Sequence, residues 1–128
     1  MKYQDEVVSS LKQFASDVSY FAGVGWWHFR YGDFPMVYIP GDESLNMIRI
    51  CIPHLDNAAA YGNELLATAI NEANREIKYV KIVVLGNNSI SINYDHKCDG
   101  ENVHAIVLHM LKTLCIAAEY LKNKLFEK

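Results

Sequence analysis

Residues 79–94, with the sequence YVKIVVLGNNSISINY, contain the two strands that decide the fold class of this chain. The first seven residues are mostly apolar and rich in β-branched side chains, whereas the last six alternate between a small polar residue and a large apolar one. Both patterns are typical of β-strands, and GNNS between them favours a reversal, so the segment predicts an antiparallel hairpin. One face of the second strand is expected to meet water, and it carries Ser89, Ser91 and Asn93.

Three segments around this hairpin have the periodicity of amphipathic helices. In residues 5–21 apolar side chains recur every three or four positions, and GVG at 23–25 is expected to end the helix because glycine tolerates a positive φ. Residues 55–77 repeat the pattern, with Asn74 as the expected stop. Residues 101–126 carry the broadest apolar stripe and are expected to form the longest helix.

Three short runs of strand length lie between the first two helices, at 26–30, 36–39 and 46–52. They are enriched in aromatic and β-branched side chains and are separated by YGDF and PGDES, which are typical turn sequences. The sequence therefore predicts a three-stranded antiparallel meander and the overall order α-β-β-β-α-β-β-α. This order describes a single α+β domain over residues 1–128, with one five-stranded antiparallel sheet and helices packed on it.

Composition restricts the class of protein. The chain has 128 residues, a net charge of −3 and 51% hydrophobic residues, as expected for one globular domain. It has no basic stripe, so we expect no nucleic-acid partner, and no apolar run of the about 20 residues that span a membrane, so we expect no membrane partner. The N-terminal residues lack the apolar stretch of a secretory signal, and the three cysteines lack CxxC spacing, so we expect reduced thiols in a cytoplasmic protein.

The GWWHFR strand is the candidate for binding. Alternation divides its side chains between two faces, and aromatic bulk assigns one set to the core, namely Trp27, Phe29 and Tyr31. On the opposite face the Arg30 guanidinium is able to stack near the Trp26 ring. Together with the second face of the next strand, this face is predicted to bind a partner through Trp26, His28, Arg30, Val37 and Ile39. Closure of the same face by a second subunit explains the pattern equally well.

The loop at 95–101 is the candidate for a metal or catalytic site, and it fails both tests. An EF-hand counted from its first acid needs oxygen ligands at the third and twelfth positions, where Lys97 and Ile106 stand. Zinc needs three or four histidine or cysteine ligands, and only His96 and Cys98 are local, so we expect no metal and no cofactor. Nothing in the sequence orients His96 as a base for a Cys98 nucleophile, so we expect no enzyme.

Residues 63–96, NELLATAINEANREIKYVKIVVLGNNSISINYDH, together with the long helix after them, resemble the YbjN-like and type III secretion chaperone-like superfamily. The similarity lies in the Asn-rich helix end INEANRE, the strand hairpin that follows and the closing helix, and in element order it extends over most of the chain. The resemblance implies a dimerising, non-enzymatic fold that binds protein segments or steadies partners. It carries over no functional residue.

These observations lead to two hypotheses of function. The first is a non-catalytic, chaperone-like protein-binding module that forms a homodimer, because the apolar surface exceeds what one sheet face needs. The alternative is a small-molecule-binding domain in which Trp26, His28 and Arg30 line a pocket for an anionic or aromatic ligand.

Overall fold

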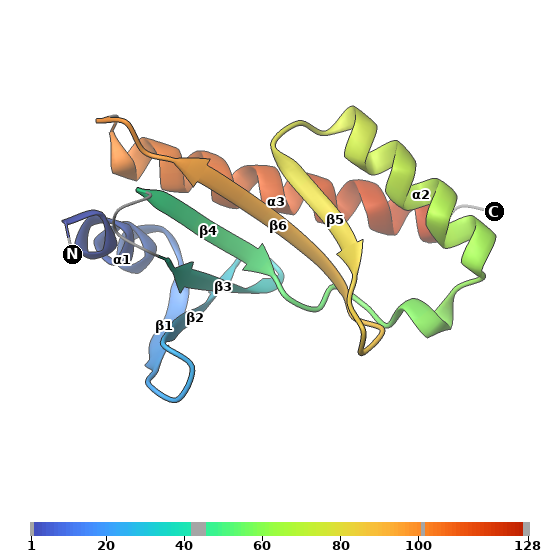
Figure 1. The fold of residues 1–128 in the computed structure, drawn as a ribbon, viewed down its shortest axis with the longest axis horizontal. Helices are drawn as coiled ribbons and strands as arrows, with labels where there is room; N and C mark the ends of the chain where they lie inside the picture. Colours follow the sequence, from blue (N-terminus) through green and yellow to red (C-terminus); the bar gives the residue numbers. More distant parts are fainter. Residues whose placement is uncertain (1, 42–45, 101, 127–128) are drawn as a thin grey trace.

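A computed structural model describes residues 2–41, 46–100 and 102–126 of the chain (Figure 1). The helices of this described part are α1 (Lys2–Phe14), the short 3₁₀-helix η2 (Ala58–Ala60), α2 (Asn63–Glu76) and α3 (Val103–Phe126). The strands are β1 (Ser16–Phe21), β2 (Trp26–Tyr31), β3 (Phe34–Pro40), β4 (Met47–Ile52), β5 (Val80–Val84) and β6 (Ile90–Lys97). Most of the predicted PGDES turn and the last residue of the predicted 95–101 loop lie outside the described residues.

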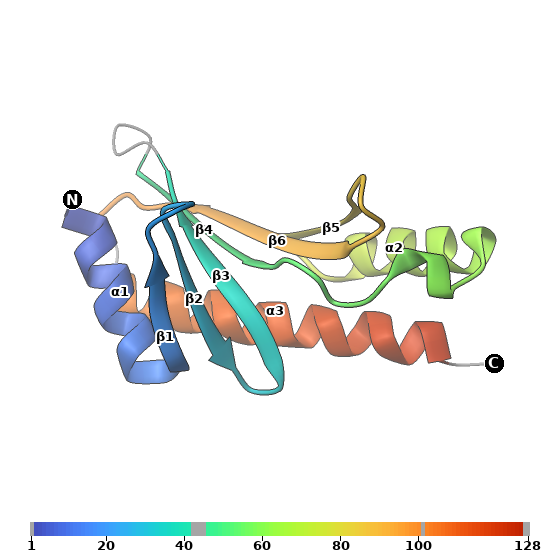
Figure 2. The ribbon, with the colours of Figure 1, turned by 90° about the horizontal axis from the view of Figure 1, so that it is seen from below.

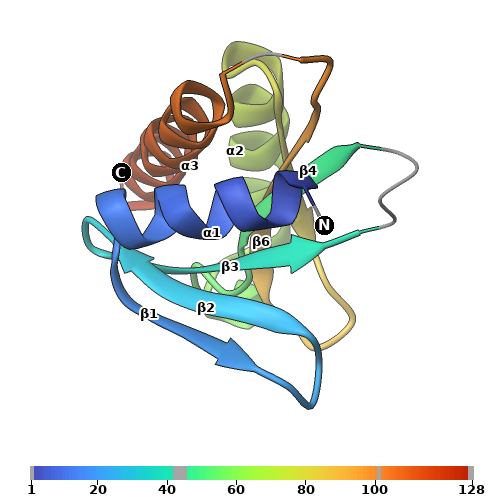
Figure 3. The same cartoon turned by 90° about the vertical axis from the view of Figure 1, so that its left-hand side faces the viewer.

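The strands form one antiparallel sheet in the order β1-β2-β3-β4-β6-β5. The helices pack on one of its faces: α3 runs along β4 and β6, α2 lies beside it, and α1 lies near the β1 end (Figures 2 and 3). The predicted α+β class with one antiparallel sheet is confirmed. The predicted hairpin at 79–94 is confirmed as well, because β5 pairs with β6.

The predicted count of five strands is wrong, because the described sheet has six. Residues 16–21, which helical periodicity assigned to the first helix, form β1 and pair with β2. α1 ends at Phe14, and Asp17, with a positive φ of 54°, lies where the β1–β2 register shifts between Ser16 and Ser19. GVG therefore closes a hairpin instead of ending a helix, with Gly25 at a φ of 72°. The observed order is α-β-β-β-β-α-β-β-α.

α3 is the centre of the core. Ten of its side chains are buried, and most of them recur at the spacing of one helix face: Val103, Val107, Met110, Leu111, Thr113, Leu114, Ala117, Ala118, Leu121 and Leu125. They pack against the inward face of the sheet, which supplies Ile50, Ile92 and Tyr94 among others. By length and composition alone α3 would also pass as a membrane-spanning helix, a test that core helices pass too.

Two element boundaries differ from the prediction. β6 continues to Lys97, so the beginning of the predicted 95–101 loop belongs to a strand that pairs with β4. α2 begins only after η2, and Asn74 lies inside its last turn instead of ending it. The side-chain amide of Asn74 accepts a hydrogen bond from the Ile82 N–H at 2.8 Å and donates one to the Ile82 carbonyl at 3.1 Å.

The predicted wet face of β6 is wrong in part. Ser89 and Ser91 are buried, and Asn93 is half-buried. The reason is that β6 is an inner strand with a neighbour on each side. β5 pairs with one of its edges, and β4, which comes much earlier in the chain, pairs with the other. The Ser91 hydroxyl donates to the Ile52 carbonyl of β4 at 3.3 Å, which compensates for the burial of its oxygen.

Candidate functional site

The sheet face that carries no helix in the described part of the chain is here named the open face. One row of paired residues crosses all six strands on this face and consists of Ser19, His28, Val37, Cys51, Asn93 and Lys81. A neighbouring row runs through Ile39, Arg49 and Asp95 on β3, β4 and β6. Because side chains alternate along a strand, these residues all point away from the helices.

A hollow of about 230 Å³ lies at the centre of the open face. Its floor is formed by Val37, Cys51 and Ser91, which are only 2%, 4% and 3% exposed although no described helix covers them. The other lining residues are Trp26, Ile39, Arg49, Pro53, Leu85 and Asn93. A mostly apolar hollow with a few polar groups is typical of a binding site for an apolar group.

Arg49 and Asp95 form an ion pair beside the hollow. The Arg49 Nε and Nη2 atoms donate to the two carboxylate oxygens of Asp95 at 2.6 and 2.8 Å. These hydrogen bonds raise the pKa of Arg49 and hold the guanidinium in one orientation. On the floor, burial raises the pKa of Cys51 to about 11, so the thiol is protonated at neutral pH.

The structure gathers three of the five residues that the sequence predicted for partner binding. Trp26, Val37 and Ile39 line the hollow together. Arg30 lies on the same face but apart from them, and its Nη2 donates to the Asp33 carbonyl at 3.4 Å. The predicted stacking of Arg30 on Trp26 is not found among the cation–ring contacts of the described residues.

His28, the fifth predicted residue, lies in a corner of the open face next to β1. Its ring centroid is 4.0 Å from that of Phe21, and its buried Nε2 has no hydrogen-bond partner among the described residues. On the helix side of the sheet, Trp27 Nε1 is also buried and has no hydrogen-bond partner among the described residues. The Trp27 ring centroid lies 5.0 Å from that of Tyr20. An unpaired buried polar atom costs about 1–3 kcal/mol, so a partner group that reaches either nitrogen would gain stability.

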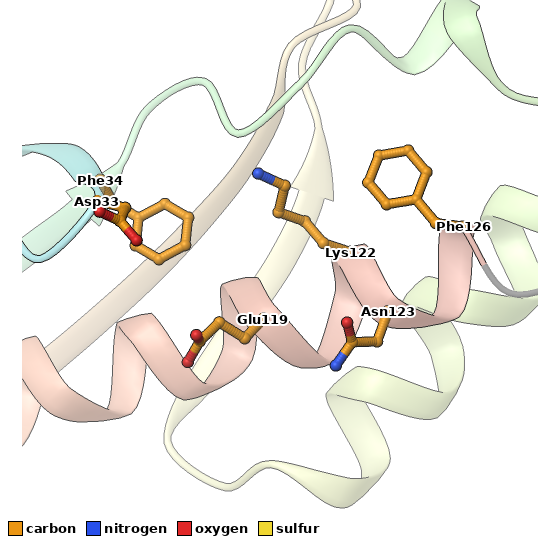
Figure 4. A pocket seen from close by; sticks show the side chains of 6 residues that line it. All are labelled: Asp33, Phe34, Glu119, Lys122, Asn123 and Phe126. Carbon is orange, nitrogen blue, oxygen red and sulfur yellow. The ribbon is translucent and has the colours of Figure 1, made fainter.

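A second hollow, of about 310 Å³, lies where the β2–β3 turn faces the C-terminal half of α3 (Figure 4). Lys122 extends between the rings of Phe34 and Phe126, with its Nζ 5.7 Å from the Phe34 ring centroid. Asp33 and Glu119 add two carboxylates to the lining. Because the hollow already holds its own cation over an aromatic ring and mixes both charges, we assign no ligand to it.

Two serine–histidine contacts lie outside the predicted sites. In the first, Ser10 Oγ lies 2.7 Å from His104 Nδ1, but Ser10 is fully buried and its hydroxyl donates to the Glu6 carbonyl.

The second contact joins Ser89 and His54. Ser89 Oγ lies 2.7 Å from His54 Nδ1. The carboxylate that interacts with His54 is Asp56, which accepts hydrogen bonds from the Tyr61 hydroxyl and the Asn57 N–H. The bond from Tyr61 is the main cause of the lowered pKa of Asp56. Ser89 is buried and Asp56 is engaged elsewhere, so the pair lacks both an oriented base and an open approach for a substrate.

His96 and Cys98, which the sequence analysis considered and rejected as a catalytic pair, are divided by the end of β6. His96 pairs with Ile48 within the sheet, and Cys98 follows the strand and is fully buried. Its backbone N–H donates to the Asn46 carbonyl at 2.8 Å, which ties the end of β6 to the start of β4. A fully buried thiol has no access to a substrate.

Sequence reasoning missed Arg49, Cys51, Leu85 and Asn93 as parts of one site. The alternation in β4 places Arg49 and Cys51 on one face and was available as a signal. Asn93 joins them only because β4 pairs with β6, and this pairing between distant segments leaves no mark in the local sequence.

No family model and no curated protein matches the chain. Among solved structures, the crystal structure of an uncharacterized protein from Methanothermobacter thermautotrophicus is similar, with a TM-score of 0.64 and 14% sequence identity over 94% of each chain. At this identity the likeness shows the fold alone, an α+β arrangement of nearly the same extent.

Proposed function

We propose that the chain is a non-catalytic, chaperone-like protein-binding module whose open face docks a segment of a partner protein. The observation that supports this function is the uncovered apolar hollow. Val37 and Cys51 are as buried as core residues, yet they lie on the face away from the helices. Trp26, Ile39 and Leu85 surround them with further apolar surface. The second face of an antiparallel sheet usually meets water, so apolar surface there favours a partner.

A protein segment suits the hollow better than a free small molecule does. Pockets for small ligands measure roughly 300–1,000 Å³, whereas this hollow measures about 230 Å³. Its size fits one large apolar side chain, whose parent chain would then lie across the sheet. The small-molecule alternative was predicted for Trp26, His28 and Arg30. Of these three, Trp26 lines the hollow and offers an aromatic ring to a compact ligand.

We further propose a homodimer that forms through β1, in keeping with the resemblance to YbjN-like proteins. The two edges of the sheet differ: Asn74 covers the outer edge of β5, whereas β1 presents Tyr20 and Phe21, which are 50% and 51% exposed. Pairing of β1 with its copy across a two-fold axis would cover both rings. The bulge at Asp17 restricts this pairing to the second half of the strand.

Site-specific photo-cross-linking tests the docking function. A photoreactive benzoylphenylalanine placed at Leu85, beside the hollow, is expected to give discrete protein adducts in a native lysate. The control is the same residue at Ile116 on α3, which is 57% exposed, compared with 42% for Leu85. Equal labelling from both positions, or none from Leu85, contradicts the proposal.

Light scattering at micromolar concentration tests the dimer, and a monomer at all concentrations rejects it. Quenching of tryptophan fluorescence by small anionic metabolites, without adducts at Leu85, would favour the small-molecule alternative.

A further inference from the structure

We infer that the partner segment is acidic: the open face takes a negatively charged stretch of chain that places one large apolar side chain in the hollow. This inference rests on the proposed function and adds to it the chemistry of the partner.

The charges of the open face carry the inference. Among the described residues, strand pairing and alternation place four basic side chains on this face: Arg30, Arg49, Lys81 and Lys97. Asp95 is the acidic side chain in the same paired rows, so cations outnumber anions there by three, whereas the whole chain has a net charge of −3. The described strand residues of the open face therefore carry a net charge opposite in sign to that of the whole chain.

The excess of positive charge is carried by the cations at the periphery of the hollow. Arg49 and Asp95 neutralise each other beside it. The remaining cations are exposed and stand on three sides: Arg30 on β2, Lys81 on β5 and Lys97 at the end of β6. An apolar centre surrounded by cations complements an apolar anchor flanked by carboxylates.

A second copy of this chain does not suit the open face. Two such faces brought together would oppose the same three cations on each side, and like charges across an interface weaken binding. Self-association through β1, proposed above, leaves the open face accessible.

Single-stranded nucleic acid is the other common polyanion, and the hollow suits it less well. Proteins bind it by stacking bases on exposed aromatic rings along a basic groove. Here the lining of the hollow contains one aromatic ring, that of Trp26, beside a floor of Val37, Cys51 and Ser91, and the His28 ring is covered by Phe21. An aliphatic and thiol floor suits a protein side chain.

The width of the sheet sets the length of the segment. Six strands spaced about 4.8 Å apart place the two outer strands about 24 Å from each other, which about eight extended residues span. A peptide of this length, anchored in the central hollow, reaches the Lys81 side and the Arg30 side together.

Fluorescence anisotropy with four labelled probes of about this length tests the inference. The probes are a glutamate/serine peptide with one central phenylalanine, its lysine-for-glutamate counterpart, its alanine-for-phenylalanine counterpart, and an oligouridylate. The acidic phenylalanine peptide is expected to bind at least about tenfold more tightly than each of the others, as three exposed ion pairs of ordinary strength and one buried ring allow. Its advantage over the lysine peptide is expected to shrink between about 10 and 150 mM salt, because the Debye length falls from about 30 to about 8 Å.

Charge reversal locates the interaction. Lys81→Glu on the open face is expected to weaken binding of the acidic peptide about fivefold. Lys112→Glu makes the same charge change at an exposed position on α3 and is expected to leave binding within about twofold. Both side chains are exposed, so both variants are expected to keep the native thermal transition, which is the control for folding.

The outcomes separate the inference from the function on which it rests. Equal binding of the acidic and lysine peptides, equal effects of the two charge reversals, or tighter binding of the oligouridylate each overturn the inference. If partner proteins cross-link at Leu85 while acidic peptides show no preference, the acidic chemistry fails and the docking function stands. If neither cross-links nor peptide binding occur at the open face, both fail.

Discussion

Asn74 joins the last turn of α2 to the outer edge of β5, and its replacement by alanine tests how this edge is held. Its amide makes two hydrogen bonds to the backbone of Ile82, one with the N–H and one with the carbonyl. A primary amide bonded in this way takes the place of a further strand, so it also closes the edge to other chains. Asn74→Ala removes both bonds and leaves the two backbone groups of Ile82 to water.

The size of the effect follows from these bonds. Two hydrogen bonds at a net of about 1 kcal/mol each contribute about 2 kcal/mol to the free energy of unfolding. Alanine has the better helix propensity by about 0.5 kcal/mol, so the expected net loss is about 1.5 kcal/mol. For 128 residues the unfolding entropy is about 0.27 kcal/mol/K, so the expected fall in Tm is about 5–6 °C.

Differential scanning calorimetry measures this fall, with Asn71→Ala as the matched control. Asn71 is exposed on the same helix and gains only the helix propensity, so Asn71→Ala is expected to raise Tm by about 2 °C. Asn74→Asp keeps an acceptor for the Ile82 N–H but turns a carboxylate oxygen toward the Ile82 carbonyl, and is expected to be no more stable than Asn74→Ala at neutral pH. Equal Tm values for Asn74→Ala and Asn71→Ala would refute the edge-closing role.

Three further results are expected. Because burial raises the pKa of Cys51 to about 11, iodoacetamide should label this thiol slowly at neutral pH, and rapid labelling of the native protein would show that the hollow has no closed floor. Arg49→Ala and Asp95→Ala should give a double-mutant coupling energy below about 1 kcal/mol that decreases with salt, because both side chains are partly exposed; a larger value that ignores salt would contradict this. Tyr61→Phe should raise the pKa of Asp56 in an NMR titration, because the Tyr61 hydroxyl is the main cause that lowers it. A lowered folded-state pKa stabilises the protein above the unfolded value of about 3.9 and loses that effect as pH falls through the folded-state value. The stability difference between Tyr61→Phe and the parent should therefore be smaller in strong acid than at neutral pH.

Local patterns predicted most of the secondary structure. The continuous run and the alternating run in 79–94 became β5 and β6, and the apolar stripe in 101–126 became α3. In each case one segment of chain carries the whole signal, because side-chain periodicity is a property of consecutive residues.

The prediction failed where two structures share one local pattern. Residues 16–21 continue the helical spacing of α1, but Val18, Tyr20 and Phe21 are equally suited to a strand. The neighbouring strand decides between the two, because Tyr20 and Phe21 contact the rings of Trp27 and His28 only when β1 pairs with β2.

The candidate site was likewise predicted in part by local patterns and decided in part by the tertiary structure. Alternation alone placed Trp26, Val37 and Ile39 on one face, and the structure brings these three around one hollow. Arg30 belongs to the same face by alternation but lies apart, because it stands near the β2–β3 turn at the far end of β2 from Trp26, where its guanidinium donates to the Asp33 carbonyl.

Sequence by itself determined which residues share a face within each strand and helix, since that depends only on the geometry of the local backbone. Tertiary structure decided which strands became neighbours. α3 must bury its broad apolar face, and the sheet that covers it brings β4 beside β6 and β1 to the edge. The hollow, its ion pair and the cations around it exist only in that arrangement, because they join segments that are far apart along the chain.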